Sequence, residues 1–288
     1  MHALPFLVSF AAATVLAPAL LRALSDAGRT LPNYRGRELP FPFGVLVLAA
    51  ASVALIPLTL LERLASVRVF LDPVLPIAVY VLGVLALGLI DDTLARDATG
   101  VDGRHERGWR GHGAALARGE LSTGTLKAFG ALGLALLTAD TAGLGLGVRL
   151  SSGRWLLAAG VLVLATNVFN LLDLRPGRAT KAFVLLGAGL AIGSADLRSL
   201  WALGLFAAPA LVAGTYDLRE RAMLGDSGSN LLGALAGLWL VLTLSGTGQL
   251  VALALLAAIT LYGEFRSISV LIERTPGLRQ LDSWGRPT

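Results

Sequence analysis

The sequence predicts an all-α protein: a polytopic integral membrane helical bundle that forms a single domain over residues 1–288. Composition is the first observation, because 55% of the residues are hydrophobic and 15% are charged, whereas about 25% are charged in an average soluble domain. Charge spacing is the second. Several uncharged intervals contain 18 residues or more, close to the roughly 20 apolar residues that cross a bilayer. Cysteine is absent, which excludes disulfide frameworks, thiolate metal sites and cysteine nucleophiles.

We expect about nine transmembrane helices. They are predicted at residues 3–22, 41–61, 73–91, 125–139, 154–172, 180–194, 199–215, 229–246 and 249–270. The second, third, fifth and seventh fill uncharged intervals of 18 to 23 residues, and the last two share one of 37 residues. The first helix has no Lys or Arg before it and four Arg after it, the reverse of a cleavable signal peptide, so we expect it to remain as an anchor. The fourth and sixth are short enough to be re-entrant or tilted.

Basic residues set the expected orientation. If alternate loops are cytoplasmic, 19 of the 24 Lys and Arg residues lie on that side and 5 on the other. By the positive-inside rule, the N-terminus then lies outside, the C-terminus is cytoplasmic, and the chain is a multi-pass protein of the plasma membrane. The same bias accounts for the net charge of +5, so no nucleic-acid partner is expected.

Two adjacent carboxylates, Asp91 and Asp92, end the third predicted helix in the segment GLIDDTL. Like charges side by side repel one another unless a cation lies between them. The pair indicates a divalent-metal or proton-handling site, and the alternative is a helix end with two solvated carboxylates. Zinc-protease, P-loop and Rossmann sites are excluded, since the sequence has no HExxH, no GxxxxGK[ST] and no helix-opening GxGxxG.

Asn167, Asn170 and Asp173 recur every three residues where the fifth predicted helix ends, in NVFNLLD. This spacing places them on roughly one helix face. Amides in an apolar segment are costly in lipid, so they normally face partners or a cavity. The two interpretations left open are a polar site and hydrogen bonding between core helices.

The segment LGDSGSNLLG, residues 224–233, concentrates small and polar residues before the eighth predicted helix. Gly225 and Gly228 permit a tight turn, while Asp226, Ser229 and Asn230 supply oxygen ligands and small donors. A helix N-terminus of this kind binds anions, and an adjacent Asp can hold Mg²⁺. An ordinary N-cap would account for only one of the polar residues.

Basic side chains are expected near these carboxylates. Lys127 begins the fourth predicted helix, and several arginines crowd residues 96–118. Each alone could reflect the positive-inside bias. Together, oxygen ligands for a hard cation and Lys or Arg donors suit a pyrophosphate.

Five segments in this order resemble the signature loops of the polyprenyl-phosphate N-acetylhexosamine-1-phosphate transferases. They are NYRGRELPFPFG (33–44), LIDDTL (89–94), NVFNLLD (167–173), LGDSGSNLLG (224–233) and ERTPGLRQLDSWGR (273–286). The resemblance implies a membrane enzyme that transfers a sugar 1-phosphate from a UDP-sugar to a polyprenyl phosphate in cell-envelope glycan synthesis, with Mg²⁺ as cofactor and Mn²⁺ as an alternative. The expected partners are the UDP-sugar and the polyprenyl phosphate, with a homodimer as an option.

Taken with the residue patterns, the resemblance assigns three sets of site residues. They are catalytic Asp91, Asp92 and Asp173; substrate-binding Lys127, Asn167, Asn170, Arg175, Arg178, Ser229 and Asn230; and metal-binding Asp226.

Two departures from the family pattern bear on the chemistry. Leu174 and Pro176 stand where the family has Gly and a second Asp, and the last loop has no histidine cluster. We therefore expect Arg175 and Arg178, helped by Arg279 or Arg286, to take over anion contacts close to the metal site. Arginine binds phosphate but cannot transfer a proton at neutral pH.

A non-catalytic lipid-phosphate-binding or scaffold homologue is therefore the alternative to an enzyme. A secondary transporter would have its site at midplane within broken helices. It is disfavoured, because ionisable residues are scarce at the predicted helix midpoints and abundant at one face.

Overall fold

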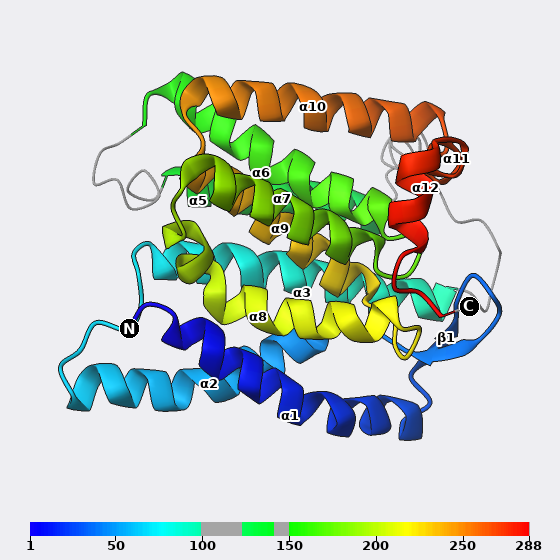
Figure 1. Cartoon of the computed structure of the whole chain (residues 1–288), viewed down its shortest axis with the longest axis horizontal. Coiled ribbons are helices and arrows are strands. Elements are labelled where there is room, and N and C mark those ends of the chain that lie inside the picture. Colours follow the sequence, from blue (N-terminus) through cyan, green and yellow to red (C-terminus); the bar gives the residue numbers. More distant parts are fainter. Residues whose placement is uncertain (99–122, 141–149, 288) are drawn as a thin grey trace.

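A computed structural model describes residues 1–98, 123–140 and 150–287. Within these ranges the chain is a bundle of long helices (Figure 1). The long helices are α1 (Leu4–Asp26), α2 (Val45–Leu64), α3 (Val74–Ala98), α5 (Thr123–Asp140), α6 (Ser152–Leu172), α7 (Arg178–Ser194), α8 (Arg198–Leu218), α9 (Gly225–Thr243) and α10 (Gly246–Phe265). Two short helices follow, α11 (Ile268–Arg274) and α12 (Pro276–Ser283). The all-α prediction is confirmed, and each apolar segment expected to be helical contains a helix.

Six helices of the described chain are long and apolar enough to cross a membrane: α1, α2, α3, α6, α8 and α10. The remaining long helices, α5, α7 and α9, have 18, 17 and 19 residues. A membrane bundle is therefore supported, with six candidate spans in place of the nine expected. The N-terminal residues and the last residues that the structure describes lie at opposite ends of the bundle (Figure 1).

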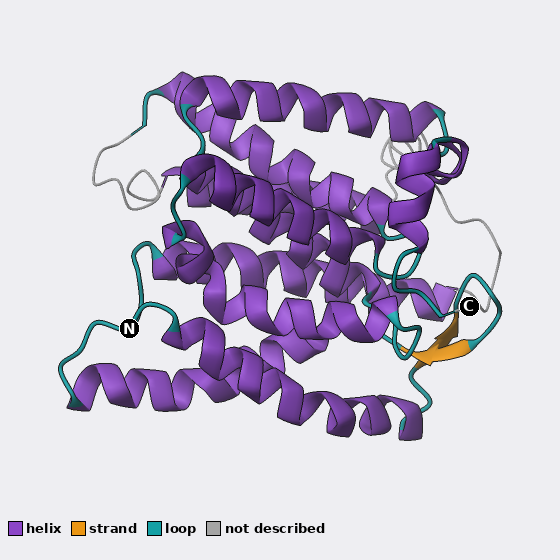
Figure 2. Cartoon of the chain, viewed as in Figure 1, coloured by secondary structure: helices purple, strands orange, loops and turns teal. Residues whose placement is uncertain are grey.

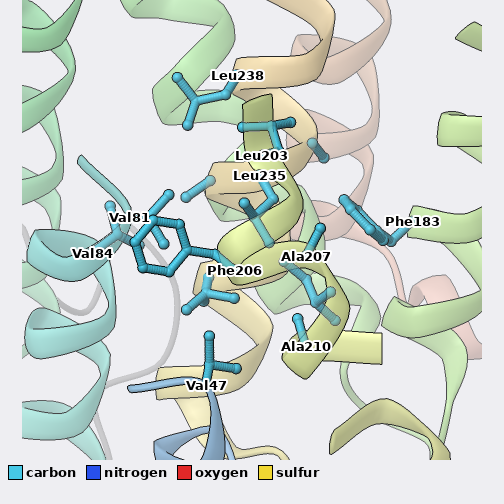
Figure 3. Packing of buried hydrophobic residues seen from close by; sticks show 14 of the residues in the cluster. Val47, Val81, Val84, Phe183, Leu203, Phe206, Ala207, Ala210, Leu235 and Leu238 are labelled. Atoms are coloured by element: carbon cyan, nitrogen blue, oxygen red, sulfur yellow. The ribbon is translucent and has the colours of Figure 1, made fainter. Parts of the chain in front are cut away.

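Helix α9 forms the centre of the bundle, where it packs against α3, α6, α7 and α8. Its glycines allow this close approach, because a Cβ added at Gly233 would lie 2.5 Å from the Cα of Thr166 in α6. Figure 3 shows Leu235 and Leu238 of α9 beside Leu203 and Phe206 of α8, all of them buried. The central position of α9 fixes the place of its N-terminus, which carries Asp226.

Several predicted boundaries are wrong. The largest difference is in α3, which continues to Ala98 instead of ending at residue 91, so Asp91 and Asp92 lie inside the helix and not at its end. Three other differences follow. Helix α2 begins at Val45 rather than at residue 41, because the N–H groups of Phe43 and Gly44 donate to the carbonyls of Met223 and Leu224. Helix α9 begins at Gly225, so the predicted tight turn through Gly228 does not form. Gly228 instead allows a close approach of the α2 N-terminus at Gly44. The last predicted helix ends at Phe265, where α11 starts a new direction.

A short antiparallel hairpin between α1 and α2 was not predicted. Strands β1 (Thr30–Pro32) and β2 (Glu38–Pro40) pair with Leu31 opposite Leu39. Figure 2 shows these strands at the end of the bundle where the chain also terminates. The hairpin forms part of the wall of the pocket described next.

Candidate active site

A pocket of about 400 Å³ opens at the end of the bundle where α3 and α6 end and α9 begins. Its lining comes from four places: the hairpin with the residue Phe41 after it, the stretch of α3 that precedes its last turns, the α6–α7 connection, and the segment from the end of α8 to the first turn of α9. The lining residues are Leu31, Asn33, Tyr34, Phe41, Asp91, Asp92, Asp173, Leu174, Arg175, Pro176, Asp217, Met223, Leu224, Gly225 and Asp226. Five of them are aspartates and one is basic, so the wall carries an excess of potential negative charge.

Lys127 bridges two of these aspartates. Its Nζ donates to Asp91 Oδ2 at 3.1 Å and also to Asp226 Oδ2. The three side chains come from α5, α3 and α9 and are 22%, 17% and 33% exposed. A cation between two carboxylates relieves their mutual repulsion. The structure therefore brings together three residues that the sequence analysis selected from separate segments.

Asn170 joins this cluster from α6. Its Nδ2 donates to Asp226 Oδ1 at 2.9 Å and contacts Ser229 Oγ at 3.5 Å. Asn167 faces elsewhere, since its Nδ2 donates to Thr260 Oγ1 of α10 at 3.2 Å. The expected polar face of α6 is thus divided: one amide orients Asp226, and the other links two helices.

Asp92 caps α9 from the neighbouring helix α3. Its carboxylate accepts hydrogen bonds from the backbone N–H groups of Asp226 at 2.7 Å and Ser227 at 2.9 Å. These N–H groups belong to the first turn of α9, which has no intrahelical acceptors for them. Because Asp92 is only 6% exposed and forms both of these hydrogen bonds, it fixes the position of the Asp226 backbone.

Asp173 lies in the pocket wall immediately after α6. Burial, together with the negative charges of Asp217, Asp226 and Asp92, raises the pKa of Asp173 well above its ordinary value. Among the described residues, no donor forms a hydrogen bond with its carboxylate. Asp173 is therefore suited to hold a proton, or to be ionised by a cation that enters the pocket.

The two arginines of the α6–α7 connection have different surroundings. Arg175 lines the pocket, lies 4.4 Å from the ring centre of Tyr34 and pairs with Glu273 Oε1 at 3.4 Å. Arg178 does not line the pocket. It donates to both carboxylate oxygens of Asp282 at 2.8 and 3.1 Å, so it holds the C-terminal segment.

The other side chains that were expected to contact an anion lie in the C-terminal segment or are buried inside the bundle. Arg286 donates to Asp282 and to the carbonyl of Pro176, and Arg279 is exposed on α12. Ser229 and Asn230 are 0% and 1% exposed inside the bundle, outside the pocket lining. Both amide atoms of Asn230 lack a hydrogen-bond partner among the described residues. The arginines expected at 104, 107, 110 and 118 lie outside the described residues.

Asp217 and Glu220 are site residues that the sequence analysis missed. Buried Asp217 accepts from the N–H of Gly177 at 2.6 Å, which ties the α6–α7 connection to the end of α8. Buried Glu220 accepts from Asn33 Nδ2 at 3.2 Å and from the Tyr34 hydroxyl at 3.1 Å. Their only sequence signal is a position at the end of an apolar segment, because their partners lie 40 and more residues away.

The pocket suits a hard divalent cation in the chemistry of its donors. Carboxylate oxygens are ligands that Mg²⁺ takes in proteins, and Asp91 and Asp226 bring two carboxylates to the one Lys127 ammonium. Asn170 contacts Asp226 through its amide nitrogen and so orients this carboxylate. Burial, and after it the negative charge of the neighbouring aspartates, raises the pKa of Asp173 at the same pocket. No group of three or more His, Cys, Asp or Glu in the described ranges already has the arrangement of a metal-ligand set.

Comparisons with known proteins add no assignment. No protein-family model matches the chain, and no curated protein is significantly similar to it.

Proposed function

We propose that the chain is a Mg²⁺-dependent phosphoglycosyl transferase that moves a sugar 1-phosphate from a UDP-N-acetylhexosamine-type donor to a polyprenyl phosphate. The observation that carries this proposal is the meeting of Asp91, Lys127, Asn170 and Asp226 at one end of a membrane bundle. A nucleotide sugar is water-soluble, and a polyprenyl phosphate has its head group at the membrane surface. A pocket at the end of apolar helices can receive both.

The reaction forms a bond between an oxygen of the lipid phosphate and the β-phosphorus of the donor, and it breaks the bond to UMP. Both reactants are anions, so catalysis requires positioning and charge compensation. Asp226 and Asp91 would hold the cation, which, when bound, offsets the negative charge of the diphosphate. Arg175 lines the pocket and would contact phosphate oxygens. Lys127 would do so when the cation takes its place between Asp91 and Asp226.

The aspartates have separate roles in this proposal. Asp92 positions Asp226 through the α9 backbone. Asp173 lacks a described hydrogen-bond donor and is the residue best suited to accept a proton from the attacking lipid phosphate. Tyr34 and Arg175 stack on one another in the pocket wall and would contact the donor there.

A transfer assay tests the proposal. Purified protein is incubated with undecaprenyl phosphate and a panel of sugar-labelled UDP-sugars, with Mg²⁺ or with EDTA. We expect label from one donor to enter the lipid fraction only with Mg²⁺. Asp226→Asn should abolish this transfer, while Asp196→Asn, an exposed aspartate near the other end of α7, should not. Binding of lipid phosphate without transfer from any donor would favour the non-catalytic alternative.

A further inference from the structure

The C-terminal helix α12 has one apolar side that the described part of the chain leaves exposed. Leu278, Leu281 and Trp284 are 44%, 37% and 74% exposed. Positions three apart on a helix are separated by about 60°, so Leu278 and Leu281 share one face, and Trp284, the C-cap residue, continues the same side. Arg279 and Ser283 lie on the opposite side, which makes α12 amphipathic.

Both ends of α12 are fixed at the end of the bundle that contains the pocket. At its start, only Thr275 separates α12 from α11, and two residues separate α11 from α10. At its end, Lys181 of α7 donates to the carbonyls of Leu281 and Trp284, each at 3.0 Å. Figure 1 shows that α12 consequently runs across the direction of α10 rather than along it.

The contacts that hold α12 come from its flank. The Asp282 carboxylate accepts hydrogen bonds from Arg178 and Arg286, and Arg178 also donates to Ser269 Oγ of α11 at 3.0 Å. Asp282 lies between the apolar side and the polar side on the helical wheel. A helix at a membrane surface needs lipid on one side, water on the opposite side and its protein attachment between them.

The helix that leads to the two short helices also exposes apolar side chains. Helix α10 is a candidate span with 22% of its apolar window buried, and it exposes Leu255 and Phe265 at 61% and 68%. Arg266, Arg274 and Arg279 are exposed around the two short helices. Basic side chains beside an apolar helix face suit a leaflet with anionic head groups.

We propose that α12 is an interfacial membrane anchor, whose Leu278, Leu281 and Trp284 enter the head-group region of the leaflet at the pocket end of the bundle. The partner is a lipid surface. Arg286, three residues after the anchored helix, donates to the carbonyl of Pro176 in the pocket wall at 2.8 Å, so the segment that leaves the anchor contacts that wall.

The native chain has no cysteine, so single labels can test this directly. Nitroxides are attached to the full-length protein at Leu278→Cys, Leu281→Cys, Arg279→Cys and Ser283→Cys, in vesicles of phosphatidylcholine with phosphatidylglycerol. Collision with oxygen reports lipid, and collision with a water-soluble nickel chelate reports water. We expect oxygen to exceed nickel several-fold at the two leucine positions and the reverse at the other two.

A second series of variants tests whether the two leucines hold the helix in the lipid. A label at Trp284→Cys should lose its lipid exposure when Leu278→Ser and Leu281→Ser are combined, but keep it with Gln280→Ser. Equal nickel accessibility on both sides of α12 would overturn the proposal. Exclusion of both reagents at the leucine positions would also overturn it, because a second copy or another protein would then cover the face. Neither readout depends on turnover or on the proposed reaction.

Discussion

Lys127 offers the sharpest perturbation of the candidate site, because its ammonium is shared by two carboxylates. Lys127→Met keeps a side chain of similar length but removes the charge. Asp91 and Asp226 would then face each other without the cation now within 3.1 Å of Asp91. We expect the free energy of unfolding to fall and the cluster to become a stronger divalent-cation site.

The magnitude follows from burial. Removing one partner of a fully buried ion pair costs about 3–5 kcal/mol. Here the side chains of Lys127, Asp91 and Asp226 remain 22%, 17% and 33% exposed, so solvent relieves part of the repulsion. We therefore expect a loss of about 3 kcal/mol, at the lower end of that range.

Thermal unfolding of the purified protein in detergent measures both effects. In EDTA, Lys127→Met should melt below the native protein, while Lys127→Arg should retain most of the stability because it keeps the charge. With Mg²⁺, Lys127→Met should recover more than the native protein gains, since the cation replaces the ammonium. If Lys127→Met melted like the native protein in EDTA, or if Mg²⁺ stabilised both equally, the shared-cation reasoning would be refuted.

Three further predictions concern packing, the C-terminal attachment and topology. A Cβ at Gly88 of α3 would lie 2.5 Å from the α9 backbone, whereas one at Gly133 meets nothing within 4 Å. Gly88→Ala should therefore lower the free energy of unfolding by about 1–3 kcal/mol and reduce sugar-phosphate transfer. Gly133→Ala should change neither. Burial opposes ionisation of Asp282, but its two arginine partners outweigh burial and lower its pKa to about 2. The ionised Asp282 should therefore stabilise the attachment of α12 by about 2 kcal/mol above about pH 4, and this stabilisation should be lost as the pH falls towards 2. Proteolytic release of α12 by an acid-active protease would detect the loss. Asp282→Asn should show no such pH dependence. Cysteines at Ser66 and Ser283, both exposed, should react with an impermeant reagent from opposite sides of the membrane, and reaction from one side would contradict the expected orientation.

Composition and charge spacing were sufficient to predict the long helices, because burial in lipid or in a helical core requires long uncharged segments. They did not predict the short helices α11 and α12, which are too short to give this signal. They could not predict the hairpin at 30–40, whose conformation depends on backbone bonds such as that from Met223 N–H to the Pro40 carbonyl. The α9 start was misplaced for the same reason. Its N-terminal N–H groups are capped by Asp92, a residue 134 positions earlier.

The site shows a similar division. Asp91, Lys127, Asn170 and Asp226 could be selected because polar residues at the ends of apolar segments are conspicuous in a membrane chain. Their partners could not be assigned from spacing. Arg178 illustrates this, since it was expected near the metal site and instead binds Asp282, 104 residues away. The position of a positively charged residue in a loop does not identify which negative charge it will meet.

Location of the β-phosphorus after the reaction tests the proposed function most directly. The donor is a UDP-N-acetylhexosamine labelled at the β-phosphorus, incubated with the purified protein, undecaprenyl phosphate and Mg²⁺. Phosphoglycosyl transfer moves that phosphorus into the lipid fraction and leaves unlabelled UMP in water. Label that entered the lipid fraction with native protein and not with Asp226→Asn would agree with the proposal. Label that remained in water as UDP, or as unreacted donor for every hexosamine tested, would contradict it.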